Sequence, residues 1–217
     1  MKKRYYVICL CMLTMLVCGE IKKNYSGTSP DTIETSSNSS SVVTARFASL
    51  VEKENRKERK IAYLTFDDGP SMHTEQIRTT LKEKNVKATF FLVTDEITGD
   101  RVKSVQNLVK DGHEVGIHTA CHEQDIIYAD KNAFLEDFDK ANKRILEVTG
   151  QKARVQRFPW GSNNGYIKGF VDEVTDELHK RGVKSFDWTV SGEDALTLYV
   201  SKNEILKNVK KDLCRFQ

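Results

Sequence analysis

Two adjacent carboxylates, Asp67 and Asp68, follow the apolar run 61–64 and precede the turn-forming pair Gly69-Pro70. A carboxylate at the end of a buried strand costs several kcal/mol to desolvate unless it is paired, hydrogen-bonded or bound to a metal. This arrangement therefore indicates a functional site. An Asx-turn that closes a strand would also explain the sequence, so the motif taken alone leaves both interpretations open.

Two histidines four residues apart, His118 and His122, follow the expected strand 114–117. On a helical turn this spacing places both side chains on one face, close enough to bind one metal ion. One carboxylate oxygen and two imidazole nitrogens form a ligand set of catalytic zinc, which keeps a further position open for water. Cys121 lies between them, but on a helix it would point away from His122, so we expect a small buried residue there.

An arginine, Arg157, stands at the end of the expected strand 153–158 and is followed by Phe-Pro-Trp-Gly. Arginine pairs with carboxylates in bidentate geometry and so orients them. Pro159 and Gly161 shape a tight loop whose backbone N–H groups could face a developing oxyanion. An ordinary loop with a surface arginine would explain the same residues.

A fourth candidate, Asp187, stands before Trp188 near the end of the expected strand 183–190. It is either buried and partnered or on the exposed side of an alternating strand. All four motifs come at the carboxyl ends of expected strands. That rim is where barrels and wound parallel sheets place their active sites.

Apolar runs and amphipathic segments alternate from residue 60 onward. We expect strands at 61–66, 86–93, 114–117, 153–158 and 183–190, and helices at 74–84, 102–110, 132–148, 170–180 and 201–213. Ser201 and Glu204 have the spacing of a capping box. Strand–helix alternation with short connections predicts an α/β fold with a mainly parallel sheet, open or closed into a barrel.

The composition excludes few functions. The chain has 217 residues, a formal charge of +3 and 30% charged residues, without a long basic stripe, so we expect no nucleic-acid partner. Residues 1–19 consist of a basic start and a short apolar run, which predicts an export signal or an uncleaved membrane anchor. Lipidation at Cys18 is disfavoured because bulky Leu16 and Val17 precede it.

Residues 20–45 are rich in Ser and Thr and nearly free of large apolar side chains, so we expect a flexible linker. The catalytic domain would then span residues 46–217. Cys121 and Cys214 are the only cysteines of that domain, which excludes a disulfide framework. A single bridge between them remains open, and we expect two buried or unpaired thiols.

In combination, the motifs resemble those of the polysaccharide deacetylases with a NodB homology domain, carbohydrate esterase family 4. The residues that carry the resemblance are Thr65–Gly69, His118–His122, Arg157–Gly161 and Asp187-Trp188. The resemblance covers the chain from about Lys60 to its end. It implies a distorted (β/α)7-type barrel and hydrolysis of N-acetyl or O-acetyl groups of a polysaccharide.

The resemblance also implies roles for individual residues. Asp67 would be the general base that takes a proton from the attacking water, and Arg157 would orient it and keep it ionised. The backbone N–H of Trp160 would stabilise the oxyanion. Asp68, His118 and His122 would hold a divalent metal, with Zn2+ expected and another transition metal as the alternative.

The family's last strand normally carries a Leu-x-His motif whose histidine acts as general acid and is tuned by the residue at Asp187. No histidine of this chain stands in such a motif. We therefore expect a domain that lacks its last strand and is C-terminally truncated, which leaves the role of Asp187 in doubt. The alternative to an active deacetylase is a catalytically impaired protein that binds metal and glycan.

The expected partner is an N-acetylated cell-wall polysaccharide, with peptidoglycan N-acetylglucosamine preferred and chitin or xylan left open. The predicted location is extracellular, either secreted or anchored to the outer face of the membrane through residues 1–19 alone. We expect a monomer.

Overall fold

The computed structural model describes residues 5–11, 61–196 and 199–215. Nearly all of these residues belong to one compact unit, Tyr6–Val17 and Ala62–Gln217, which contains every candidate site residue. The remaining residues form a second unit that lies almost entirely outside the described part of the chain. The predicted linker, residues 20–45, falls wholly outside it.

The strands form one sheet with the order β6-β5-β4-β3-β2-β1-β7. The strands of the described residues are β1 Tyr5–Cys11, β2 Ile61–Gly69, β3 Ala88–Val93, β4 Glu114–Thr119, β5 Val155–Gln156, β6 Lys184–Ser185 and β7 Val190–Ser191. The pairs β2–β3, β3–β4, β4–β5, β5–β6 and β1–β7 are parallel. Because β6 and β7 lie at opposite edges, the sheet does not close, and the α/β fold is a distorted, open barrel.

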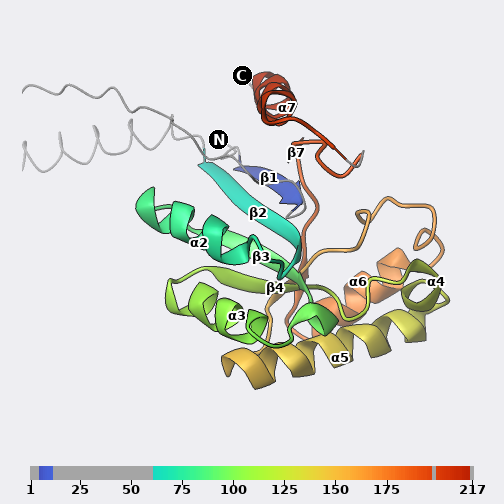
Figure 1. The fold of residues 1–217 in the computed structure, drawn as a ribbon. Coiled ribbons are helices and arrows are strands. Elements are labelled where there is room, and N and C mark those ends of the chain that lie inside the picture. The colour runs from blue at the N-terminus through green and yellow to red at the C-terminus, as the bar shows by residue number, and fades with distance from the viewer. Residues whose placement is uncertain (1–4, 12–60, 197–198, 216–217) are drawn as a thin grey trace, which may run out of the picture. The chain divides into compact units, whose positions relative to one another are not determined.

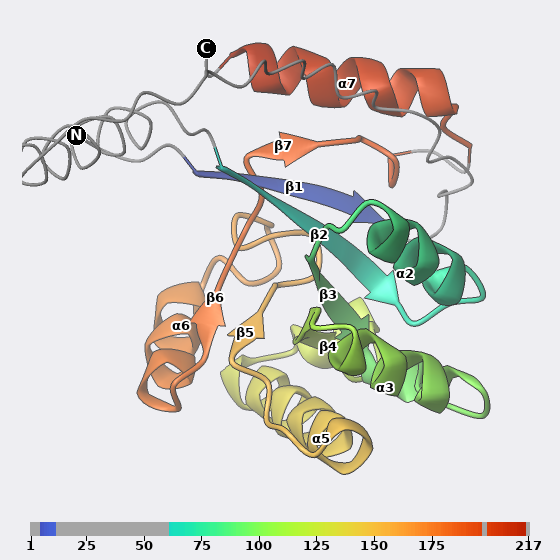
Figure 2. The same ribbon diagram turned by 90° about the vertical axis from the view of Figure 1, so that its left-hand side faces the viewer.

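The helices of the described residues are α2 Thr74–Glu83, α3 Arg101–Lys110, α4 Gln124–Ile127, α5 Lys131–Thr149, α6 Val171–Lys180 and α7 Lys202–Cys214, with a 3-10 turn η1 at Thr94–Glu96. Except for the short α4, which packs against α5, the helices lie on the outer side of this curved sheet (Figures 1 and 2). The capping box of α7 is present as predicted, with Ser201 as N-cap and Glu204 reaching back to it. No helix of the described residues is long and apolar enough to cross a membrane.

The apolar core lies between the sheet and its helices. Phe66 of β2 stacks on Phe90 of β3 with ring centroids 5.1 Å apart, and both are buried. Successive side chains of a strand point to opposite faces, so Phe91 points away from this layer. Gly116 of β4 makes room for it, because a Cβ there would lie 2.8 Å from the Phe91 ring.

Two irregularities of register occur where the site residues stand. Phe66 pairs with Phe90 and Gly69 with Leu92, so β2 carries one extra residue around Asp67 and Asp68. Between β3 and β4, the extra residue is His118. Such bulges redirect side chains and are common next to active sites.

Two predicted strands are shorter than expected. The segment 153–158 is a strand only at Val155–Gln156, and the segment 183–190 is split into β6 and β7. The carbonyl of Phe186, which would continue β6, accepts a hydrogen bond from the Arg157 Nε at 2.9 Å instead. Strand β1 lies within residues 1–19, and the predicted export signal or anchor there stays a prediction.

Candidate active site

A buried ion pair lies at the carboxyl end of β2. Arg157 is 0% exposed and Asp67 4%, and the Arg157 Nη1 donates to the Asp67 Oδ1 at 2.8 Å. The same nitrogen donates to the Thr65 Oγ1 at 2.8 Å. The guanidinium lies over the ring of Phe91, 4.3 Å from its centroid. Because these contacts fix the guanidinium, Arg157 holds the Asp67 carboxylate in a defined orientation.

Three ligand-type side chains meet beside this pair. The Asp68 Oδ1 lies 3.2 Å from the His118 Nε2 and 3.4 Å from the His122 Nε2. One ligand atom from each of the three lies within 4.8 Å of the others, the only such group of three or more within the described residues. The predicted metal ligands therefore converge.

The His118 ring has a defined orientation. Its Nδ1 lies 2.9 Å from the carbonyl oxygen of Arg157, so in the neutral ring the Nδ1–H donates there and the Nε2 lone pair faces Asp68. This is how metal-binding histidines are commonly oriented. Burial opposes protonation of His118, but the hydrogen bond to Asp68 and the charges of Asp67 and Asp68 outweigh it and raise the pKa.

The His122 ring has the opposite shift. Burial and the neighbouring His118 lower the pKa of His122, which favours a neutral ring with a free lone pair. Two imidazoles around one carboxylate oxygen fit a divalent cation, because the cation would neutralise the carboxylate and accept both lone pairs. The residues present therefore fit the implied metal.

The helical turn predicted for the two histidines is wrong. His118 belongs to β4. His122 follows a bend in the chain, and its own φ is 59°, in the left-handed region. Asp68 also has a left-handed φ, 64°. The ligands converge because a strand bulge and two left-handed residues turn them inward, whereas helical periodicity plays no part.

Asp137 of α5 supports the segment between the histidines, although no motif in the sequence marks this residue. Its Oδ2 accepts hydrogen bonds from the Thr119 Oγ1 and the Ala120 N, each at 2.7 Å, and its Oδ1 accepts from the Cys121 N at 3.2 Å. The Thr119 Oγ1 in turn accepts from the backbone N of His122 at 3.3 Å. Cys121 is half-buried and Cys214 is exposed, and neither forms a disulfide.

The loop after Arg157 is tightly shaped. Trp160 and Gly161 both have left-handed φ angles, 61° and 80°. The Asn164 side chain donates to the carbonyls of Pro159 and Gly161 at 3.1 and 2.7 Å. Within the described residues, no hydrogen bond uses the Trp160 N–H. The Trp160 ring packs against His122, with centroids 4.8 Å apart.

Asp187 stands in the exposed connection between β6 and β7. Its carboxylate accepts hydrogen bonds from the Ser162 N at 3.0 Å and from the Ser162 Oγ. Its backbone carbonyl accepts from the Arg157 Nη2 at 3.4 Å. The sequence left Asp187 either buried with a partner or exposed. In the structure it is exposed, and its carboxylate also has a partner, Ser162. Its carboxylate supports the Trp160 loop.

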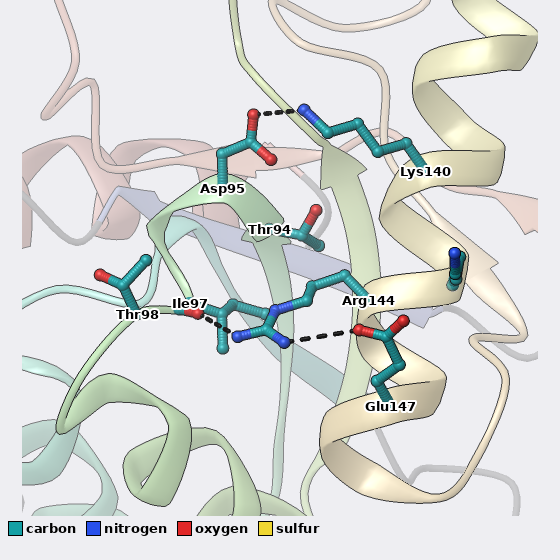
Figure 3. A pocket seen from close by; sticks show the side chains of 8 residues that line it. Thr94, Asp95, Ile97, Thr98, Lys140, Arg144 and Glu147 are labelled. Carbon is teal, nitrogen blue, oxygen red and sulfur yellow. Dashed lines mark hydrogen bonds and ion pairs between the residues drawn. The ribbon is translucent and has the colours of Figure 1, made fainter.

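A cavity of about 360 Å³ lies apart from this site, between η1 and α5 (Figure 3). Two of its cations are already partnered, since Lys140 pairs with Asp95 at 2.7 Å and Arg144 donates to the Ile97 carbonyl at 2.6 Å. None of the metal-ligand candidates lines it.

Comparison with known proteins agrees with the geometry. Residues 54–186 match the family model described as polysaccharide deacetylase. The chain is 37% identical over 145 residues to a peptidoglycan-N-acetylglucosamine deacetylase of Bacillus cereus, covering 64% of this chain and 49% of the relative. It is 31% identical over 163 residues to a chitooligosaccharide deacetylase of Rhizobium leguminosarum, covering 73% and 68%.

A solved structure gives the same fold. The catalytic domain of a peptidoglycan N-acetylglucosamine deacetylase from Eubacterium rectale superimposes with a TM-score of 0.66 and 35% identity, covering 70% of each chain. The chain spans about half the length of the Bacillus cereus relative, and about half that of a further relative from Bacillus subtilis that is 31% identical to it.

Proposed function

Because the chain belongs to the polysaccharide deacetylase family, we propose that it hydrolyses N-acetyl groups of a cell-wall glycan and releases acetate. Peptidoglycan N-acetylglucosamine is the substrate we favour, because a relative that is 37% identical is named as a deacetylase of this substrate. The observation that carries the proposal is the buried Asp67–Arg157 pair directly beside Asp68, which faces both histidines.

A divalent metal, zinc in our proposal, would be held by Asp68, His118 and His122. When bound it would act as a Lewis acid that polarises the acetyl carbonyl and acidifies water. The ligand set of one carboxylate and two imidazoles is compatible with other divalent transition metals too. Asp137 would keep the segment between the histidines in place.

The residues of this chain then divide the work of amide hydrolysis. Asp67 accepts a proton as water adds to the acetyl carbon, and Arg157 keeps its carboxylate aimed. The Trp160 N–H donates to the oxyanion that develops. As the carbon–nitrogen bond breaks, the leaving nitrogen takes up a proton, and we assign Asp67 as its donor. The amine and acetic acid that form then ionise to the ammonium group and acetate.

We also propose an extracellular location, secreted or anchored to the outer face of the membrane. The support is the basic and apolar sequence of residues 1–19, which has the order of charges and apolar residues typical of export segments.

The test is acetate release from N-acetylglucosamine oligomers and from peptidoglycan by the zinc-loaded chain. Asp67→Asn and removal of metal by a chelator are each expected to abolish release. Asp139→Asn is the matched control, because Asp139 is an exposed acid on α5 that pairs with Arg181. Zinc and oligomer binding without acetate release would support the alternative, a protein that binds glycan without hydrolysing it.

A further inference from the structure

Two exposed aromatic side chains lie next to the candidate metal site. Trp160 is 46% exposed and Tyr166 is 53% exposed. Their ring centroids are 6.3 Å apart at an angle of 65°. The Trp160 ring contacts the rings of both His122 and Tyr166, so the pair adjoins a candidate metal ligand. We call Trp160 and Tyr166 the aromatic shelf.

The shelf is exposed but well supported. The Tyr166 ring lies nearly parallel to the buried ring of Tyr128, with centroids 6.4 Å apart and an angle of 9°. The Tyr128 hydroxyl donates to the Pro159 carbonyl at 2.9 Å, and the Tyr166 N donates to the Asn164 Oδ1 at 2.9 Å. A supported ring loses little conformational freedom when a ligand binds, so it is suited to recognition.

We propose that the aromatic shelf binds the sugar ring adjacent to the one that is deacetylated. This inference rests on the proposed function, since it takes the substrate to be a polymer of N-acetylhexosamine. One face of a pyranose ring presents mainly C–H groups, which pack against the flat apolar face of an aromatic ring. Exposed aromatic groups that adjoin a site are the surface expected for such contacts.

The shelf also predicts how activity depends on substrate length. A small acetyl ester reaches the metal site without touching Tyr166, whereas a chain of several sugars covers the shelf. Tyr166 therefore favours longer substrates, and its contribution is measured as the ratio of kcat/KM for the N-acetylglucosamine pentamer to kcat/KM for 4-nitrophenyl acetate.

The experiment compares Tyr166→Ala, Tyr166→Phe and Tyr199→Ala in the zinc-loaded chain. We expect Tyr166→Ala to lower the ratio roughly five- to tenfold, through KM for the pentamer, and Tyr166→Phe to restore most of it because the ring remains. Tyr199→Ala is the matched control, since Tyr199 is an exposed tyrosine before α7 and outside the shelf. It should leave the ratio at the wild-type value.

A binding measurement separates this inference from the proposed function. Calorimetric dissociation constants for the pentamer, measured on the same proteins, report on the shelf even if no acetate is released from any substrate. Weaker binding of the pentamer by Tyr166→Ala, with Tyr166→Phe and Tyr199→Ala close to the wild type, would support sugar binding by the aromatic shelf. Equal affinities and equal ratios in the wild type and Tyr166→Ala would overturn it, whether or not the chain is a deacetylase.

Discussion

The Asp137 carboxylate accepts a hydrogen bond from the Thr119 hydroxyl at 2.7 Å, and this contact joins helix α5 to the segment between the two histidines. The same Thr119 oxygen accepts from the His122 N–H, so the contact extends from the helix to a candidate metal ligand. The position of His122 therefore depends on a residue of α5 that would not itself touch the metal.

Loss of the Thr119 hydroxyl should weaken metal binding. Thr119→Val keeps the shape of the side chain but removes both hydrogen bonds, and residues that orient metal ligands typically contribute about 10–100-fold to metal affinity. We expect a loss in this range, with Thr119→Ser close to the wild type. The measurement is zinc affinity by competition with a chromogenic chelator, alongside urea unfolding of the metal-free protein. Equal zinc affinity in Thr119→Val and the wild type would contradict the prediction.

The buried pair of Arg157 and Asp67 should show strong energetic coupling. Arg157→Met removes the cation that pairs with the buried Asp67 carboxylate, and breaking a buried pair in this way costs about 3–5 kcal/mol of unfolding free energy. In the double variant Arg157→Met/Asp67→Asn, no buried charge is stranded, so its loss should be smaller than the sum of the two single losses. Urea unfolding of the four proteins measures this coupling. Additive losses would show that the two residues do not form a pair in solution.

Much of the site could be predicted because its chemistry is local in sequence. Each motif combines reactive side chains with a strand end, and parallel strands bring those ends to one edge of the sheet. Five of the predicted site residues accordingly lie together, as expected: Asp67, Asp68, His118, His122 and Arg157. The fold class followed from the alternation of apolar runs and amphipathic segments.

What the sequence did not predict depends on contacts between distant segments. Asp137 stands in an amphipathic helix, where an acid normally faces solvent, and its role appears only when α5 packs beside Thr119. The bulges at Asp68 and His118 depend on strand register, which has no local signal. The strand predicted at 183–190 breaks because Arg157, distant in sequence, takes the Phe186 carbonyl.

Gly161 should tolerate no side chain. Its φ is 80°, and a Cβ would lie 3.2 Å from the ring of Trp188. A residue with a Cβ costs about 1–2 kcal/mol in the left-handed region, before any contact with the ring is counted. We expect Gly161→Ala to lower the free energy of unfolding by at least this amount and to raise KM for oligomers, because the Trp160 loop shifts.

The control for Gly161 is Gly165→Ala in the same loop. Gly165 has no left-handed φ, and a Cβ there would meet no atom within 4 Å. It should leave the free energy of unfolding nearly unchanged, as measured by urea unfolding. Equal losses of unfolding free energy in Gly161→Ala and Gly165→Ala would contradict the prediction that the left-handed φ of Gly161 requires glycine.

The stability of the fold should fall at mildly acid pH because of His113. This histidine is buried, and its Nδ1 accepts a hydrogen bond from the Ala88 N at 3.2 Å, so protonation at Nδ1 would break that bond. Burial and the charge of Lys87 lower the pKa of His113. In the unfolded chain, this histidine has the ordinary pKa of about 6.5 and therefore binds more protons below that pH than it does in the folded chain. The free energy of unfolding thus decreases as the pH falls through about 6.5.

His113→Asn tests this pH dependence, because the asparagine Oδ1 can accept from the Ala88 N without titrating. Urea unfolding midpoints measured from pH 8 to pH 5 should fall more steeply in the wild type than in His113→Asn. His179→Asn is the control, since His179 lies exposed near the end of α6. Its pH profile should parallel that of the wild type. Parallel profiles for all three proteins would mean that His113 does not couple protonation to folding.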